Sequence, residues 1–390
     1  YPTNDLITGP DIIFFWVARM IMAGNEYMGD VPFKHVYFTG IVRDKLGRKM
    51  SKSLGNSPDP IELIEKYGAD GVRMGMLLTA PAGNDLPFDE SICEQGRNFA
   101  NKIWNALRLV KGWQHSDELQ QSRENELAIQ WMEQRMAQVL EGVERDFANY
   151  RLSEALMASY KLVWDDFCSW YLEMVKPAYG QPIDRETLAA TLDIFEKLMC
   201  MLHPFMPFVT EEIWHTLRPA CREGESIMVA PMPQSVPYDE KFLADFAMAQ
   251  EMIAGVRALR NTKGISPKEQ LELYVRGQFP AQFSGILTKL ANLSKVEAVE
   301  QKMDGALTFM VGTTECFVPV SQNIDKDEEI KKLQEELKYA EGFLASVMKK
   351  LSNEKFVNGA PEKVVAIERK KQADAEQKIA ALKAQIASLQ

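Results

Sequence analysis

The residues best suited to chemistry lie in one short basic stretch, Lys-Met-Ser-Lys-Ser, at residues 49–53. A run of aromatic and β-branched residues at 35–39 predicts a strand before it. Asp59 followed by Pro60 predicts the start of a helix after it. We therefore interpret the stretch as a mobile loop, hinged by a glycine on each side. Its two ammonium groups could neutralise the charge that builds up as a pyrophosphate leaves. A solvated basic turn is the alternative.

A second pair of candidate residues, Asp11 and Trp16, stands near the beginning of the chain. The apolar run at 12–20 predicts a buried helix, with Asp11 as its cap. A carboxylate at a helix start can bind an ammonium group, and an indole about one and a half turns later can wall an apolar pocket. A capping aspartate and a core tryptophan are the structural alternative, which the residue types alone favour.

The composition limits the classes of protein to which the chain can belong. Its 390 residues are 46% apolar and 26% charged, which is ordinary for a soluble protein of about two to three domains. The net charge of −10 excludes a surface that is cationic throughout, but not a local basic patch. The five cysteines form no CxxC pair, which indicates reduced thiols, no metal site and a cytoplasmic protein. The longest apolar run, 12–23, is too short to span a bilayer.

Helical periodicity dominates the middle of the chain. After a Gly/Pro/Asp loop at 82–89, apolar residues at helical spacing predict an α-helical bundle. Six of the seven tryptophans lie between Trp104 and Trp214, and at this period we expect most of them in the core. A helix at 239–260 and a small α+β piece follow. The strands of that piece are expected around a helix at 283–292, at 271–275, 298–300, 307–309 and 315–320.

Two stretches of apolar heptads end the chain, at 330–351 and 375–389. Their matched lengths and the short break between them, at 352–361, predict an antiparallel coiled-coil hairpin. Basic residues gather on this arm and at the end of the helix at 239–260, where they could contact a phosphate backbone. A solvated coiled-coil face, dimerisation and stabilisation of a helix C-terminus are the alternatives. The cations singled out are Arg257, Arg260, Lys263, Lys349, Lys350, Arg369 and Lys370.

The motifs together resemble one family. Residues 49–53 match the signature loop of class I aminoacyl-tRNA synthetases at every position. The pattern Gly-x-Asp-Ile-x-Phe-x-Trp at 9–16 and the phrases at 97–105, 167–171 and 203–214 resemble valyl-tRNA synthetases of bacterial type. A C-terminal coiled-coil arm is a further feature of that family. We therefore expect a mainly α fold divided into residues 1–85, 86–235, 236–324 and 325–390.

The resemblance implies a role for each part. The first part would be the end of a Rossmann-type catalytic domain, followed by an anticodon-binding bundle, a small α+β subdomain and a tRNA-binding arm. Asp11 and Trp16 would hold the amino acid, and Lys52, supported by Lys49, would stabilise the transferring phosphates. The partners would be valine, ATP with Mg²⁺, and valine tRNA, and the protein would be a monomer. The residues lying along the ATP would be Lys49, Met50, Ser51, Lys52 and Ser53.

Two alternatives stay open. The first is a related enzyme specific for isoleucine, against which the spacing from Asp11 to Trp16 and the terminal arm both weigh. The second is a non-catalytic tRNA-binding module whose loop is vestigial. Because the chain starts at Tyr1, without a methionine, we expect it to be a piece of a longer protein.

The chain contains no His-x-Gly-His sequence, which class I activation also requires by the same resemblance, and no inserted editing domain. We therefore predict that the purified chain by itself catalyses no valine-dependent exchange of pyrophosphate into ATP. Exchange above the level of a heat-denatured sample would refute this prediction.

Overall fold

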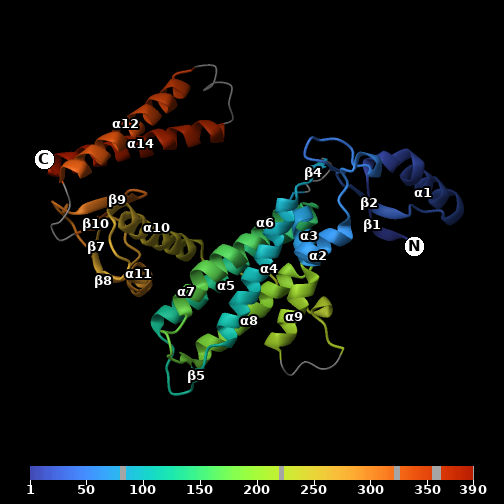
Figure 1. Cartoon of the computed structure of the whole chain (residues 1–390), viewed down its shortest axis with the longest axis horizontal. Coiled ribbons are helices and arrows are strands. Elements are labelled where there is room, and N and C mark those ends of the chain that lie inside the picture. The colour runs from blue at the N-terminus through green and yellow to red at the C-terminus, as the bar shows by residue number, and fades with distance from the viewer. Residues whose placement is uncertain (80–84, 219–223, 320–325, 354–361, 390) are drawn as a thin grey trace. The chain divides into compact units, whose positions relative to one another are not determined.

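The structure is a computed structural model, and it describes residues 1–79, 85–218, 224–319, 326–353 and 362–389 (Figure 1). The chain divides into two compact units, Tyr1–Leu243 and Ala244–Gln390. Both are rich in helices, so the mainly α fold class predicted from the sequence is confirmed. Nothing in this division tests the four-part organisation, which stays a prediction.

The first unit opens with a parallel strand pair. β1 (Thr3–Thr8) runs beside β2 (Phe33–Phe38), with Asp5 opposite His35. A second parallel pair, β3 (Val42–Arg43) and β4 (Leu86–Pro87), brackets the segment that contains the basic loop. The helical elements between β1 and β2 are η1 (Pro10–Ile12), η2 (Ile13–Val17), α1 (Ala18–Ala23) and η3 (Gly24–Met28).

The prediction of a buried helix over the apolar run at 12–20 is wrong. The run is divided among three short helical elements, and Val17 is its one buried residue. Phe14 and Phe15 are 82% and 67% exposed. An apolar run indicates a preference for burial, but burial requires a facing surface, and the described residues place none against this side.

Three helices connect the loop to the bundle. α2 (Pro60–Tyr67) begins where it was predicted, because the Asp59 carboxylate accepts a hydrogen bond from the Ile61 amide at 2.8 Å. α3 (Ala69–Leu78) then packs closely on α4 (Glu90–Lys111). The two backbones meet at Gly71 and Gly96, where a Cβ on Gly96 would lie 2.4 Å from the Gly71 carbonyl oxygen. This crossing therefore requires glycine.

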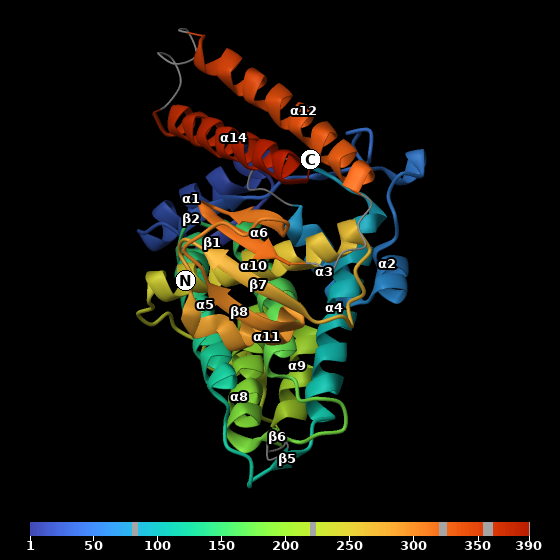
Figure 2. The ribbon, with the colours of Figure 1, turned by 90° about the vertical axis from the view of Figure 1, so that its left-hand side faces the viewer.

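α4 is one helix of the α-helical bundle, and the other helices pack beside it (Figure 2). Phe99, Phe167 and Phe195 are fully buried in its core. The expectation that most of the six tryptophans are core residues is wrong, because Trp131 and Trp214 are buried, Trp104 is 38% exposed and the other three are only partly buried. Its other elements are α5 (Arg123–Ala148), α6 (Leu152–Lys161), η5 (Leu162–Tyr171), α7 (Leu172–Val175), α8 (Arg185–Leu202), α9 (Pro207–Leu217) and η6 (Ile227–Val229), with a short parallel bridge of β5 (His115–Ser116) and β6 (Ile183–Asp184).

The second unit combines a sheet with the coiled-coil hairpin. α10 (Glu240–Lys263), α11 (Ser284–Ala291) and a four-stranded sheet of order β8-β7-β10-β9 form its base. The strands are β7 (Leu271–Arg276), β8 (Leu293–Ala298), β9 (Leu307–Val311) and β10 (Thr314–Val318). The strand predicted at 298–300 therefore ends at 298, because Asn292, in a left-handed conformation, ends α11 and begins the strand earlier.

α12 (Lys326–Leu351) and α14 (Glu362–Leu389) run side by side as the predicted antiparallel hairpin (Figure 1). Their seam buries Ala340 against Ile379 and Leu382, and Glu341 pairs with Lys383 across it at 2.9 Å. The break between the two heptad stretches lies mostly outside the described residues.

A carboxylate on α3 fixes the junction between the loop region and the bundle. Met206, at the N-cap of α9, provides no side-chain cap. Asp70 provides it instead, because its two oxygens accept hydrogen bonds from the Phe208 and Val209 amides at 3.2 and 2.6 Å. One turn away, Arg73 donates to the carbonyls of Pro204 and Phe205, each at 3.1 Å. α3 thereby satisfies both the donors and the acceptors of the α8–α9 turn.

Replacing Asp70 by alanine should lower the free energy of unfolding of the first unit by about 1–3 kcal/mol, because two partly buried amides lose their acceptor. Asp70→Asn retains one acceptor and should lose less. All seven tryptophans precede residue 243, so tryptophan fluorescence during denaturation reports on this unit alone. Asp117→Ala, at an exposed carboxylate, is the control. Equal stability of the Asp70 and Asp117 variants would contradict the capping role.

Candidate functional site

The basic loop begins with a turn that is built around one buried carboxylate. Asp44 is 8% exposed, and one of its oxygens accepts hydrogen bonds from the Leu46 and Arg48 amides at 3.0 and 2.8 Å. Its other oxygen accepts from the Arg48 guanidinium at 2.8 Å. Gly47 adopts a left-handed φ of 73° at the tip of this turn, which only glycine adopts without strain. Asp44 thus fixes the chain that enters the loop.

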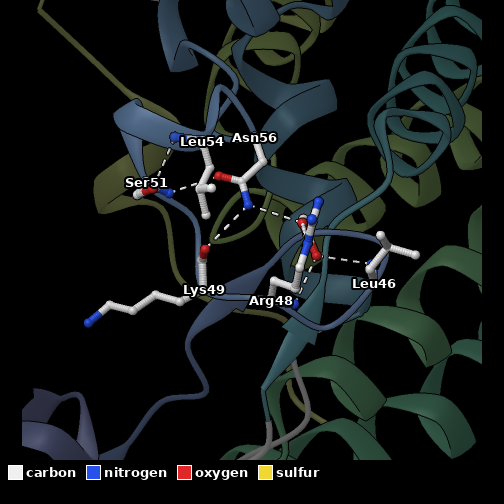
Figure 3. Close-up of polar contacts among 7 residues, drawn as sticks. Leu46, Arg48, Lys49, Ser51, Leu54 and Asn56 are labelled. Atoms are coloured by element: carbon white, nitrogen blue, oxygen red, sulfur yellow. Dashed lines mark hydrogen bonds and ion pairs between the residues drawn. The ribbon is translucent and has the colours of Figure 1, made fainter.

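Asn56 closes the loop from the other end (Figure 3). Its amide nitrogen donates to the Asp44 carboxylate at 3.0 Å and to the Lys49 carbonyl at 3.3 Å. Its amide oxygen accepts from the Ser51 backbone amide at 2.9 Å. One side chain therefore holds the start, middle and end of the loop together, so the loop is a hydrogen-bonded structure between its two glycines.

Alternate residues of the loop point to different surroundings. Met50 is partly buried against the apolar cluster of Leu63, Tyr67, Phe88 and Cys93. Lys49 is exposed, and its side chain extends away from Asn56 (Figure 3). The hydroxyls of Ser51 and Ser53 lie 3.1 Å apart. The Lys52 side chain lies outside the described residues, although its backbone begins η4 (Lys52–Leu54). Met50 therefore anchors the loop while Lys49 presents a cation.

The electrostatics of the loop favour the ionised form of Asp44. The hydrogen bond from Asn56, supported by those from Arg48 and Leu46, lowers the pKa of Asp44 to about 2 against the opposing effect of burial. A second carboxylate nearby behaves similarly. Asp89 caps α4 through the Ser91 amide and pairs with Lys45 at 2.9 Å, which lowers its pKa to about 2 as well. Both carboxylates are therefore charged at neutral pH.

The two candidate amino-acid-binding residues lie in the short helical elements that follow β1, Asp11 in η1 and Trp16 in η2. Asp11 is in η1 and exposed, and Gly9 rather than Asp11 is the N-cap, which corrects the capping prediction. Trp16 is 55% exposed, with the Arg19 guanidinium 5.8 Å from its ring centre. Among the described side chains, no hydrogen bond or ion pair joins either residue to the basic loop.

The cations predicted at the end of α10 differ in accessibility. Arg260 is buried, and its guanidinium donates to the carbonyls of Ser266, Ala291 and Asn292 at 2.9–3.1 Å. The prediction that Arg260 binds tRNA is therefore corrected to a structural role, because a side chain committed to three carbonyls supports the α11–β8 turn. Arg257 is exposed but also donates, to the Leu290 carbonyl at 2.8 Å. Lys263 is partly buried.

The cations predicted on the arm are all exposed. Lys349 and Lys350 end α12, and Arg369 and Lys370 lie near the start of α14. Sequence reasoning missed Glu368, which is 7% exposed at a seam position and bonds Lys371 at 2.7 Å. Its place three residues after Val365 in the heptad pattern is the signal that could have found it.

Three family models match the chain. Residues 1–89 match tRNA synthetases class I (I, L, M and V), 130–275 match the anticodon-binding domain of tRNA ligase, and 325–390 match the valyl tRNA synthetase tRNA binding arm. The basic loop falls within the first match. All three models describe parts of tRNA synthetases, which places this chain among the class I tRNA synthetases.

Curated relatives narrow this class to one family. The valine--tRNA ligases of Parabacteroides distasonis and Phocaeicola vulgatus are 59% and 62% identical over 100% of this chain. That of Chlorobaculum tepidum is 38% identical over 95% of it. The chain belongs to the valyl-tRNA synthetase family, which confirms the resemblance seen in the sequence. It spans 44% of the length of each of these relatives, at their C-terminal end.

The similarity to solved structures is weaker than the similarity to these relatives. The LeuRS of Agrobacterium radiobacter K84, in a ternary complex with tRNA and LeuAMS, aligns with a TM-score of 0.45 and 18% identity over 72% of this chain and 31% of that one. These values are too low to define a shared fold. Among the described residues, no helix has the length and apolarity needed to cross a membrane. Within the same residues, no group of acidic, histidine or cysteine side chains is placed to hold a metal ion.

Replacing Asn56 by alanine should loosen the loop, because Asp44, Lys49 and Ser51 all lose a partner. Trypsin should then cut at Lys49 roughly two to ten times faster, the factor expected for one or two ordinary hydrogen bonds. Asn105→Ala, on the exposed side of α4, is the matched control. Equal cleavage of the two variants would contradict the closing role of Asn56.

The same variant should change the titration of Asp44. In the wild type its pKa of about 2 lies below the ordinary 3.8, so the contribution of this carboxylate is complete above about pH 4 and lost as the pH falls through 2. Asn56→Ala removes the main cause of the shift and should move the pKa upward, which the Asp44 carboxyl resonance measured by NMR would report.

Proposed function

We propose that the full-length protein is a valine--tRNA ligase, which activates valine with ATP and transfers it to the 3′ end of valine tRNA. The single observation that carries this proposal is the 59% and 62% identity, over the whole chain, to relatives of that name. The chain itself would supply the signature loop, the anticodon-binding bundle and the tRNA-binding arm. The four-part division at residues 85, 235 and 324 belongs to the same proposal.

The basic loop is proposed to lie along the ATP phosphates, which Mg²⁺ would accompany. Lys49 and Lys52 would stabilise the charge that develops as pyrophosphate leaves, and residues 50–53 would follow the nucleotide. The exposed ammonium of Lys49 supports this role, because it is free to approach a phosphate without breaking the loop. The Asp44–Asn56 network also supports it, since a preorganised cation stabilises a transition state better than one that must first be ordered.

Asp11 and Trp16 are proposed to hold valine. The Asp11 carboxylate would bind the ammonium group of the amino acid, and the Trp16 indole would wall the pocket for its side chain. Their exposure in the chain supports this proposal, because a residue that binds a ligand must present its side chain.

The tRNA interface is proposed on the bundle and on the arm. Lys349, Lys350, Arg369 and Lys370 would contact phosphates of the tRNA, with Arg257 and Lys263 as weaker candidates. The exposure of the four arm cations supports this assignment. We further propose that the protein acts as a monomer in the cytoplasm. The described cysteines, Cys93, Cys168, Cys200 and Cys316, are free thiols, which fits a reducing compartment.

The ligase proposal is tested with the full-length protein. Valine, but not isoleucine, should support efficient charging of tRNA. Lys49→Ala should reduce valine-dependent pyrophosphate exchange about 100-fold, the usual loss when one preorganised group is removed from a developing charge. Lys34→Ala, at an exposed lysine of β2, should change it less than about threefold. Isoleucine charging would replace the proposal by the related isoleucine enzyme.

The interface is tested with the chain itself. It should bind valine tRNA more tightly than isoleucine tRNA, and the affinity should fall steeply with salt. Replacing Lys349 and Lys350 together by alanine should reduce the slope of log affinity against log salt by about two. Lys383→Ala, whose ammonium is paired with Glu341, should leave the slope unchanged. No binding at all would favour a structural role for the arm.

A further inference from the structure

Tyr150 adopts a backbone conformation that its residue type disfavours. It follows Asn149, the C-cap of α5, and has a left-handed φ of 57°. Its amide donates to the Phe147 carbonyl at 3.0 Å, and the Arg151 amide donates to the Asp146 carbonyl at 2.8 Å. This pair of hydrogen bonds defines a Schellman motif, a helix C-terminus in which the left-handed residue is usually glycine. A tyrosine here costs conformational energy that glycine would avoid, so its side chain needs an explanation.

The phenol of Tyr150 reaches the strand pair at the beginning of the chain. It donates a hydrogen bond to the Asp5 carboxylate on β1 at 2.5 Å and lies 2.8 Å from the Nδ1 of His35 on β2. Asp5 and His35 are register partners, and their side chains are 3.0 Å apart. Because the phenol donates to Asp5, a single hydrogen on Nδ1 of His35 would be shared between the Asp5 carboxylate and the Tyr150 oxygen. The Tyr150 ring also packs at 5.8 Å from the rings of His35 and Tyr37.

The two strands lead directly to the two proposed substrate segments. β1 ends at Thr8, three residues before Asp11. β2 ends at Phe38 and leads through β3 into the loop that begins at Asp44. Tyr150 therefore contacts β1, which precedes the proposed amino-acid site, and also β2, which precedes the signature loop.

We propose that Tyr150 is a positioning residue, which couples the anticodon-binding bundle to the active site by holding the β1–β2 pair against the end of α5. The proposal rests on the proposed function. tRNA held by the bundle would restrain α5, and the Tyr150 phenol would pass this restraint to both strands. The residue touches neither substrate, so its effect should appear in the step that requires tRNA and not in amino-acid activation alone.

The kinetic experiment uses the full-length protein with Tyr150→Phe, which keeps the ring and the backbone conformation but removes the hydroxyl. The kcat for tRNA charging should fall about tenfold, equivalent to about 1.4 kcal/mol. The KM for tRNA and the rate of valine-dependent pyrophosphate exchange without tRNA should stay within about twofold. Tyr179→Phe is the matched control, because Tyr179 is fully exposed.

Two further variants separate coupling from simple support of the fold. Tyr150→Gly relieves the left-handed backbone, so its Tm should be equal to or above that of the wild type while its charging kcat still falls. Asp5→Asn should lower the same kcat. Its combination with Tyr150→Phe should be no worse than the more severe single variant, because both changes break one contact.

Three results would overturn the proposal. An unchanged kcat with a lowered Tm in Tyr150→Phe would mean that the phenol only supports the fold. A raised KM for tRNA with an unchanged kcat would mean that Tyr150 contacts the tRNA itself. Additive effects of the Asp5 and Tyr150 changes would mean that the two residues act separately.

The failure of the proposed function would be seen elsewhere, as a wild-type protein that does not charge tRNA with valine. In that case the contact is still tested in the chain by amide hydrogen exchange. Tyr150→Phe should speed exchange in β2 severalfold relative to Tyr179→Phe, because β2 loses its tie to α5. Equal exchange in the two variants would overturn the coupling proposal whatever the enzyme catalyses.

Discussion

The N-terminus of α9 has its hydrogen-bonding requirements met by another helix, and this constraint organises the first unit. Because Met206 offers no side-chain oxygen, the amides of Phe208 and Val209 depend on Asp70. Burial raises the pKa of Asp70 even though the two amides and Arg73 favour the charged form. The carboxylate offsets this cost because it offers a separate oxygen to each of the two amides, which the single amide oxygen of an asparagine could not do. The contact fixes α3, and with it the region that carries the signature loop, to the bundle.

The signature loop separates the groups that shape it from the group that is offered to a ligand. Asp44 and Asn56 use their hydrogen-bonding capacity within the loop, and Met50 packs into an apolar cluster. Lys49 is left exposed between them. This division lets a flexible lysine be presented from a fixed backbone. It would reduce the conformational entropy lost on binding of a phosphate, which is the ligand proposed for this loop.

The arm carries a polar group where its pattern calls for an apolar one. Glu368 lies in the seam of the hairpin, and one of its oxygens has no hydrogen-bond partner among the described residues. Lys371 satisfies the other oxygen, and with Lys350 it lowers the pKa of this carboxyl. A buried charge contributes little to stability, but it penalises any register that leaves it unpaired. Lys371 lies on α14 itself, so only the attraction between Glu368 and Lys350 on α12 depends on how the two helices are aligned.

The sequence by itself determined the features that depend on local chemistry. Residue type and spacing were enough to predict the cap at Asp59, the glycine-bounded loop, the amphipathic helices and the heptads. Short-range sterics and hydrogen bonds determine these features. The tertiary structure decided the rest. It exposed Phe14 and Phe15, buried Arg260 among three carbonyls, and brought Asp5, His35 and Tyr150 together from three separate segments. Burial and long-range contacts depend on which surfaces meet in the fold. The periodicity of one segment does not indicate which distant segment will pack against it.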